Sequence, residues 1–336
     1  MRVFAVNDQS HVAEVRREAG NIGRKAGLPE DDLGRLAIVA TELATNQLKH
    51  AGHGEILVGV YEDATGGGVE LVGIDKGPGI RNLDESFRDG HSTAGSAGQG
   101  LGSLRRQSDV FDIASWPERG TAILARITAR KPGRSYLPPA SYSWGGLSVP
   151  LPGEDACGDA FSVRCEHGRL SALVADGLGH GPVAATASSA AVRAFAGLNG
   201  TAPVDALRII HDALRPTRGA AVALLRLDDT GAHYAGIGNI AGAVVRSEGM
   251  SRMVSVSGTA GVTQTKVRVF TYPAGPGALV VLASDGVMTN WQLDAYPGLK
   301  RAHPTLIAAV LFRDFSRRRD DATVVVIRAE HAVATS

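Results

Sequence analysis

Acidic residues recur in the second half of the sequence, at the ends of short apolar runs. They are Asp159 in GDAF, Asp176 in VADGLGHG, Asp285 in LASDG, and Asp320 and Asp321 in RRRDDATV. A single acid-glycine pair is usually only a turn, but strand ends are where a sheet gathers side chains from distant parts of a chain. Carboxylates that converge without matched bases repel one another and require cations, and ligation by oxygen alone favours Mg²⁺ or Mn²⁺. Two such ions can activate a bridging water for in-line attack on a phosphoester.

A second set of polar residues lies in the first half, on one predicted helix. Glu42, Asn46 and Lys49 are spaced i, i+4 and i+7 in TELATNQLKHA, on a face distinct from the apolar stripe of the helix. A carboxylate and a carboxamide so placed can orient an attacking group and ligate Mg²⁺, which takes oxygen donors. An ordinary solvated helix face has the same spacing, so the helix alone favours no site.

Two glycine-rich segments downstream favour a nucleotide pocket. Asp75 ends a predicted strand, and Gly77 and Gly79 follow it in DKGPGI. This turn permits close backbone approach to a ligand, and the acid can accept a hydrogen bond from a purine amino group. The segment GQGLG then enters a predicted helix whose N-terminal amides can bind phosphates, and it contains Gly98, Gly100, Leu101 and Gly102. The three pieces in this order predict a nucleotide site.

The elements that position these residues fall into two groups. A helix is predicted over residues 29–51, and strands over 55–62, 69–75 and 121–128. Further along, short apolar runs predict strands at 170–176, 219–228, 241–246, 278–285 and 322–330, with helices at 182–198 and 203–214. Both groups mix helix and strand without regular alternation, which predicts an α+β fold with largely antiparallel sheets.

The chain is long enough for two domains. Its 336 residues exceed the size at which one core usually keeps growing. The segment KPGRSYLPPASYSWGG breaks the regular patterns with proline, glycine and serine. We therefore predict a first domain at 1–131, a linker at 132–146, a second domain at 147–330 and a C-terminal tail at 331–336.

Composition excludes several classes of protein. The formal charge of +1 gives no general attraction to nucleic acid or anionic membrane, and no apolar stretch approaches membrane-spanning length. The start MRVFAVNDQS lacks the features of a signal peptide, so we expect a cytoplasmic protein. The two cysteines, Cys157 and Cys165, form no zinc motif and are expected to be reduced thiols.

Residues 1–130 resemble the GHKL ATPase domain, with ELATN, DKGPGI and GQGLG similar to its N, G1 and G2 boxes. The GLGSLRRQSD ending resembles the anti-sigma-factor kinase branch, especially the stressosome switch kinases. The resemblance implies a two-layer Bergerat-type sandwich that binds ATP. Asn46 would hold Mg²⁺, Glu42 would act as base or orient a water, and Asp75 would read adenine. The glycines would shape the pocket and its lid, placed at 81–97, and Thr121 would lie beside the adenine.

Residues 145–330 resemble the PPM metal-dependent serine/threonine phosphatases, in the branch of the sporulation phosphatase E and the stress-response phosphatases. The resemblance implies an α-β-β-α sandwich. Its metal site would use Asp176, the carbonyl of Gly177, Asp285, Asp320 or Asp321, and Asp159, which can act through a water. The family's arginine for the substrate phosphate is matched by no fixed motif, and Arg164 is the candidate.

The two resemblances together predict a switch that both adds and removes phosphate. The N-terminal domain would phosphorylate, and the C-terminal domain would dephosphorylate, serine or threonine on a STAS-domain regulatory protein. One alternative makes the N-terminal domain a non-catalytic, nucleotide-gated docking module that regulates the phosphatase. Another makes the chain an anti-sigma factor that sequesters a sigma factor. Kinases of this branch often pair through the same domain, which is compatible with a homodimer.

Overall fold

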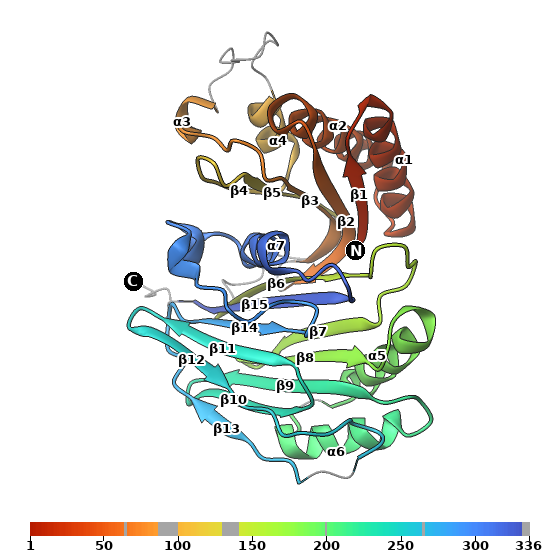
Figure 1. Ribbon diagram of the computed structural model, residues 1–336, viewed down its shortest axis with the longest axis vertical. Coiled ribbons are helices and arrows are strands. Elements are labelled where there is room, and N and C mark those ends of the chain that lie inside the picture. The colour runs from red at the N-terminus through yellow and green to blue at the C-terminus, as the bar shows by residue number, and fades with distance from the viewer. Residues whose placement is uncertain (64–65, 87–99, 130–140, 199, 264–265, 331–336) are drawn as a thin grey trace. The chain divides into compact units, whose positions relative to one another are not determined.

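The computed structural model describes residues 1–63, 66–86, 100–129, 141–198, 200–263 and 266–330 (Figure 1). The chain forms two compact units. The first consists of Met1–Leu137 and Gln292–Arg313, and the second of Pro138–Trp291 and Asp314–Ser336. The predicted C-terminal tail and most of the predicted linker lie outside the described residues.

The first unit contains a five-stranded antiparallel sheet with the order β1-β2-β3-β5-β4. Its strands are β1 (Arg2–Val6), β2 (Gly54–Asp63), β3 (Gly66–Ile74), β4 (Val110–Ser115) and β5 (Thr121–Thr128). Its helices in residues 1–137 are α1 (Gln9–Lys25), α2 (Glu30–Asn46), α3 (Leu83–Ser86) and α4 (Gly100–Gln107). Apolar residues of α1, α2 and α4 pack on one face of the sheet in a core that includes Val15, Leu36, Leu71 and Leu104. This is the two-layer α/β sandwich that was predicted.

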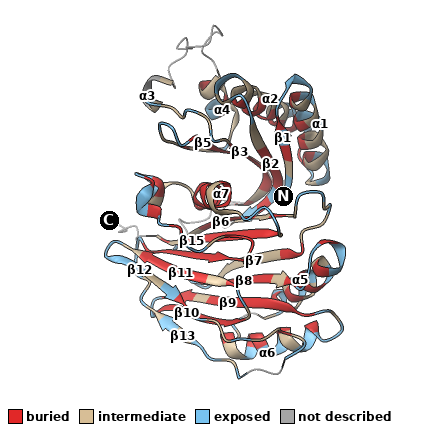
Figure 2. Ribbon diagram, in the orientation of Figure 1, coloured by how far each residue is buried: buried red, intermediate tan, exposed pale blue. Residues whose placement is uncertain are grey.

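The opposite face of this sheet is also buried (Figure 2). Leu57, Val72 and Leu124 are fully buried on β2, β3 and β5, yet they lie outside the helix-side core. Residues 292–313 belong to this unit, and Arg126 on β5 donates to Thr305 Oγ1 at 2.9 Å. The segment contains the 3₁₀ turns Leu293–Ala295 and Leu299–Arg301 and begins helix α7 (Pro304–Phe315). A segment from late in the sequence therefore completes the first unit, which the sequence patterns did not predict.

Helix α2 does not continue regularly to residue 51 as predicted. After Asn46 the chain widens into a π-helical turn, Gln47–Ala51. The buried Gln47 donates from Nε2 to the carbonyl oxygens of Glu55 and Ile74, at 2.9 and 3.0 Å. A π turn changes the angular spacing of side chains, so Lys49 does not keep the i+7 position that a regular helix would give it.

The second unit contains two five-stranded antiparallel sheets. One has the order β13-β10-β9-β8-β7, and the other has the order β12-β11-β14-β15-β6. The strands are β6 (Tyr142–Val149), β7 (Asp159–Glu166), β8 (Arg169–Gly177), β9 (Ala220–Asp228), β10 (Gly231–Ile237), β11 (Ala241–Arg246), β12 (Gly249–Met253), β13 (Phe270–Tyr272), β14 (Leu279–Ala283) and β15 (Ala322–Ala329). Helices α5 (Gly181–Ala196) and α6 (Pro203–Leu214) pack on the first of these sheets through a shared core that includes Leu173, Leu207 and Val222.

The second unit begins before the predicted boundary at residue 147. Tyr142, Trp144, Gly145 and Gly146 belong to β6, which pairs with β15, so the linker ends earlier than predicted. The paired glycines look like a turn in the sequence, but a Cβ on Gly146 would lie 2.8 Å from the carbonyl oxygen of Val324. Glycine is thus required here by close packing inside a sheet. Among the described residues, no helix has both the length and the apolar character needed to cross a membrane.

Candidate functional site

The predicted acidic residues lie at the ends of strands of the second unit. Asp159 is the first residue of β7 and stands directly opposite Asp176, near the end of β8. Asp285 follows β14 by two residues, and Asp321 immediately precedes β15. Antiparallel pairing of β7 with β8 and of β14 with β15 thus brings distant segments to common edges.

The carboxylates of this cluster act strongly on one another. Burial raises the pKa of Asp176 to about 9, with further upward contributions from Asp159, Asp285 and Asp320. Burial also raises the pKa of Asp159 to about 7, and the negative charges of Asp321 and Asp320 add to the effect. These effects show that Asp159, Asp176, Asp285 and Asp320 belong to one acidic cluster. Such a cluster is stabilised when its carboxylates either bind protons or bind cations.

A metal ion fits the donors of this cluster. Asp159 is 4% exposed, and its Oδ2 atom is buried without a hydrogen-bond partner among the described residues. In those residues, no group of three or more histidine, cysteine, aspartate or glutamate side chains is arranged so that all of them could hold one metal ion. Mg²⁺ needs only one or two carboxylates because it keeps several waters, so an open arrangement of carboxylates suits it.

Asn239 supports Asp285 directly. Its Nδ2 donates to Asp285 Oδ2 at 2.6 Å. The pKa of Asp285 is raised first by burial and then by Asp320, while Arg317 lowers it. In the sequence, Asn239 ends the segment GIGN, which has the composition of a turn. No sequence signal links Asn239 to Asp285, which is 46 residues away, so sequence reasoning missed this residue.

Asp320 and Asp321 differ in their surroundings. Asp321 is 2% exposed, and its two carboxylate oxygens accept hydrogen bonds from the backbone amides of Leu151 and Gly158, at 2.8 and 2.9 Å. A Cβ on Gly158 would lie 2.6 Å from Asp321 Oδ2, so glycine permits this contact. Asp320 instead raises the pKa of both Asp176 and Asp285. Asp321 thus binds the backbone and acts electrostatically on Asp159, whereas Asp320 acts on Asp159, Asp176 and Asp285.

Three other residues close in sequence to Asp159 and Asp176, namely Cys157, Gly177 and His180, have structural roles. The carbonyl of Gly177 lies at the end of β8, where a Cβ would come 2.1 Å from Ala184 O, so glycine allows α5 to approach. His180 pairs with Glu154 at 2.7 Å. Burial, and next Asp159, raise the pKa of Cys157 far above its usual value, which fits a packing thiol and disfavours a nucleophile.

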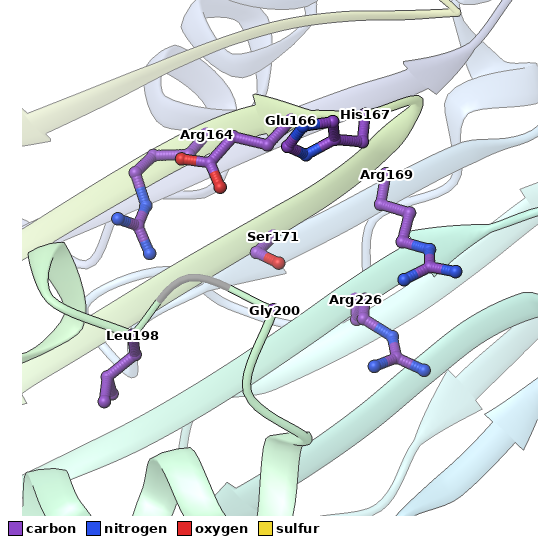
Figure 3. A pocket seen from close by; sticks show the side chains of 8 residues that line it. All are labelled: Arg164, Glu166, His167, Arg169, Ser171, Leu198, Gly200 and Arg226. Carbon is purple, nitrogen blue, oxygen red and sulfur yellow. The ribbon is translucent and has the colours of Figure 1, made fainter.

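Arg164 does not lie at the acidic cluster. It is five residues along β7 from Asp159, and its guanidinium donates to the carbonyl oxygens of Phe195 and Ala196 at the end of α5. It lines a pocket with Arg169, Arg226 and others (Figure 3). Arg226 in turn pairs with Asp228 at 3.2 Å. Arg164 and Arg226 thus have structural partners, and this pocket is not part of the acidic cluster.

In the first unit, Asp75 forms the floor of the candidate nucleotide site. Its Oδ1 accepts hydrogen bonds from the backbone amides of Gly77 and Thr121, at 2.8 and 3.2 Å. Burial raises its pKa, and these two amides oppose the effect. Gly79 has a φ of +69°, and a Cβ there would lie 2.0 Å from the carbonyl oxygen of Trp116, so only glycine fits this turn. The structure brings Asp75, Gly77 and Thr121 together as expected.

Asn46 meets the start of α4. Its Nδ2 is buried without a hydrogen-bond partner among the described residues, and a Cβ on Gly100 would lie 2.9 Å from its Oδ1. An unpaired amide beside a helix N-terminus fits an oxygen-rich ligand such as a nucleotide phosphate with its Mg²⁺. Leu101 and Gly102 lie in the same first turn of α4.

The remaining predicted residues of the nucleotide site are Glu42, Lys49, Gly98 and those of the lid. Glu42 lies one turn before Asn46 on α2 and is half-buried, whereas Lys49 is exposed on the π turn. Gly98 and residues 87–97 of the predicted lid lie outside the described residues.

Comparisons with known proteins match two separate parts of the chain. Residues 5–127 match the histidine kinase-like ATPase domain, and residues 166–330 match stage II sporulation protein E. Over 128 residues the chain is 31% identical to the serine/threonine-protein kinase RsbT of Bacillus subtilis, covering 36% of this chain and 96% of RsbT. A solved structure described as the bacterial stressosome, a modular system adapted to control secondary messenger signalling, is 30% identical with a TM-score of 0.51, covering 56% of this chain and 99% of that one.

These matches agree with the order of motifs and with the two folds. A kinase-like ATPase domain precedes a domain that matches stage II sporulation protein E. The chain therefore belongs to the family of the RsbT kinase through its histidine kinase-like ATPase domain, and it carries a SpoIIE-type phosphatase domain after it.

Proposed function

We propose that this chain is a bifunctional phosphorylation switch. Its second unit hydrolyses phosphoserine or phosphothreonine on a STAS-domain regulatory protein, and its first unit phosphorylates the same protein from ATP. The observation that carries the proposal is the clustering of four aspartates at strand ends, where Asp159 stands opposite Asp176 and where burial and neighbouring carboxylates, including Asp320, raise the pKa values of Asp159, Asp176 and Asp285. Such a cluster is stable in its ionised form only with bound cations.

The proposed metal ligands are Asp176, the carbonyl oxygen of Gly177, Asp285 and Asp320, with Asp159 acting directly or through a water. Bound Mg²⁺ or Mn²⁺ supplies a water of lowered pKa and neutralises charge on the phosphoryl group. Asn239 fixes the orientation of Asp285, and Ser284 and Thr323 donate to Asp159. Asp321 keeps the chain before β15 bound to the amides of Leu151 and Gly158, and so positions Asp320.

The kinase part of the proposal rests on the nucleotide site. Asp75 would accept a hydrogen bond from the adenine amino group, and Thr121 lies beside it. Asn46 would hold Mg²⁺ with the ATP phosphates near the first turn of α4. Glu42, one helical turn from Asn46, would orient or deprotonate the attacking hydroxyl.

A nucleotide-gated docking module is the second candidate for the first unit. The observation that favours it is the packing of residues 292–313 in that unit, which links it by the chain itself to the segment before Asp320. The described residues offer no contact that specifically favours sequestration of a sigma factor. A cytoplasmic location and a homodimer stay predictions.

Intact-mass spectrometry of a purified STAS-domain substrate tests both activities. The substrate is incubated with ATP, Mg²⁺, Mn²⁺ and either the wild type or Asp285→Ala. A bifunctional switch gives little net phosphoprotein with the wild type and accumulates it with Asp285→Ala. Phosphoprotein in neither reaction rejects the kinase and leaves the docking module. A prephosphorylated substrate then tests the phosphatase alone, and turnover that survives both EDTA and Asp176→Ala rejects the metal-dependent mechanism.

A further inference from the structure

A cavity on one sheet of the second unit is lined mainly by basic side chains (Figure 3). Its charged lining consists of three arginines and one histidine against one glutamate, namely Arg164, Arg169, Arg226, His167 and Glu166. Arg164 is five residues from Asp159 on β7, which corresponds to roughly 16 Å along a strand. The proposed phosphatase and kinase chemistry therefore makes no use of this cavity.

The strand register brings the basic residues together. Arg164 on β7 stands directly opposite Ser171 on β8, and Ser171 stands directly opposite Arg226 on β9. Directly opposed residues of an antiparallel pair lie on the same face of a sheet. Arg169 is two residues from Ser171 on the same strand and therefore shares that face. The fold thus gathers three guanidinium groups near one serine hydroxyl.

This row of residues lies where the helices that cover the face come to an end. Leu173, two residues further along β8, is part of the core beneath α5 and α6. Arg164 instead donates to the carbonyl oxygens of Phe195 and Ala196, at 2.8 and 2.6 Å, in the last turn of α5. Carbonyl oxygens carry no formal charge, so these bonds leave the Arg164 guanidinium a cation. The row is therefore covered by a cavity and not by a packed helix.

The positive charge of the row is only partly matched by acids. Arg226 Nε lies 3.2 Å from Asp228 Oδ2, and this buried Nε makes no hydrogen bond to a described residue. Glu166 is the register partner of Arg169, yet the Arg169 side chain forms neither a hydrogen bond nor an ion pair within the described part of the chain. Guanidinium groups gathered on one face repel one another, and an anion between them removes that repulsion. The unmatched donors favour an anionic ligand.

The size of the cavity indicates a single anionic group. Its volume is about 70 Å³, whereas pockets that enclose a drug-sized ligand have roughly 300–1,000 Å³. Guanidinium groups bind phosphate through charge-assisted hydrogen bonds that are often paired, and a serine hydroxyl can donate to a further oxygen. A carboxylate carries one charge and two acceptor oxygens, so it matches fewer of these donors. A phosphate group is the ligand that suits both the size and the donors.

We propose that this cavity is a binding site for a phosphate group, either as inorganic phosphate or as the phosphate of a small phosphomonoester. Arg169 and Arg226 bind its oxygens, Ser171 donates to it, and Arg164 holds the end of α5 beside it. The site is separate from the acidic cluster and needs neither bound metal nor ATP. It therefore does not depend on either of the proposed activities.

A titration of the full chain with inorganic phosphate in EDTA tests the site. The acidic cluster holds no metal under these conditions, so phosphate has no cation to bind there. Shifts of the backbone amide resonances locate the ligand. We expect saturable shifts in residues 164–171 and at Arg226, which are distinct from any shifts at residues 100–104 of the candidate nucleotide site.

The same titration with phosphoserine identifies the source of the phosphate group. Shifts of residues 164–171 with both ligands support a site for phosphomonoesters. Shifts with inorganic phosphate alone support a site for the free ion.

Substitutions in the lining should change the affinity in opposite directions. Arg169→Met removes an exposed side chain and should weaken phosphate binding about tenfold, since a hydrogen bond to a charged group contributes at least this much. Glu166→Gln removes the one acid of the lining and should strengthen binding by roughly two- to fivefold. Arg193→Met, at an exposed position of α5 outside the lining, is the matched control and should leave the affinity unchanged.

Three results would overturn the proposal. The first is the absence of saturable shifts in residues 164–171 with inorganic phosphate. The second is an equal phosphate affinity in Arg169→Met and Arg193→Met. The third is an equal set of shifts when chloride replaces phosphate at the same ionic strength, because these side chains would then respond to salt and not to a bound phosphate.

Discussion

Asp159 and Asp176 stand directly opposite each other across the β7–β8 pair. Like charges at directly opposed positions destabilise a sheet, and here both carboxyls are also largely buried. The pair therefore costs folding free energy when ionised without a partner. A bound cation removes this cost, which makes the stability of the protein depend on metal and on pH together.

The metal-free protein should lose stability as pH rises. The folded-state pKa values of Asp159 and Asp176 are raised to about 7 and about 9 from a usual value of 3.8. Their contribution to stability is fully present below the unfolded pKa and is lost as pH rises through the folded values. Urea unfolding in EDTA should thus show a decrease between pH 5 and pH 9, and Asp176→Asn should flatten it. If the free energy of unfolding falls with pH equally in the wild type and in Asp176→Asn, the raised pKa of Asp176 does not explain the pH dependence.

Asp320 and Asp321 should separate metal binding from stability. Asp321→Ala removes the acceptor of two buried backbone amides and should lower the free energy of unfolding by about 2–4 kcal/mol. Asp320→Ala removes a negative charge from the cluster but also the acceptor of Asp321 N, so it should lower the free energy of unfolding without metal by less than Asp321→Ala does, and it should abolish one Mn²⁺ site. Calorimetric Mn²⁺ titration and urea unfolding measure the two effects. The assignment is reversed if Asp321→Ala alone loses the metal.

Gly100→Ala should weaken nucleotide binding without destabilising the fold. The new Cβ would lie 2.9 Å from Asn46 Oδ1, at the place proposed for the metal and phosphates. We expect an affinity for ATP at least about tenfold lower, which corresponds to about 1.4 kcal/mol. Gly34→Ala is the control, because it is an exposed position of α2 with no atom within 4 Å of the added Cβ. It should raise stability by about 0.5–1 kcal/mol and leave ATP affinity unchanged, and equal ATP affinity in both variants would contradict the proposed site.

Asn239→Ala should reduce metal affinity at the acidic cluster. The side chain holds Asp285 Oδ2 at 2.6 Å, and loss of a partner that orients a ligand typically costs about 10–100-fold in metal affinity. Asn21→Ala, on the surface helix α1, is a control with the same change of side chain. Mn²⁺ titration followed by electron paramagnetic resonance distinguishes them. Equal affinity in the two variants would show that Asn239 does not support a metal ligand.

The fold of each unit could be predicted from the sequence because local patterns specify it. The β-branched and apolar runs at 121–128 and 322–330 form β5 and β15 almost as expected, and the proline-led segments form α5 and α6. Candidate site residues could also be named from the sequence, because they lie in short motifs at strand ends and helix starts. Asp75 and Asp176 are such residues, and each is next to glycine or one residue from it.

The contacts that join distant segments could not be predicted in this way. The packing of residues 292–313 in the first unit uses backbone carbonyls, those of Ala295, Pro297 and Asp75, which carry no signature in the sequence. Any residue type at these positions offers the same acceptor. The sequence also could not distinguish the roles of Asp320 and Asp321. Their roles depend on which carboxylate accepts hydrogen bonds from the backbone amides of Leu151 and Gly158, and two adjacent aspartates give no pattern that predicts this.

The proposed chemistry of the acidic cluster is hydrolysis of a phosphoprotein with bound metal. The most direct measurement is the initial rate of phosphate release from a phosphoserine-containing STAS-domain protein, as a function of free Mn²⁺, for the wild type and Asp176→Asn. We expect the rate of phosphate release by the wild type to rise with Mn²⁺ and saturate. The rate for Asp176→Asn should be at least about 100-fold lower at every Mn²⁺ concentration. A wild-type rate that is unchanged by EDTA, or an Asp176→Asn rate equal to that of the wild type, contradicts the proposed chemistry.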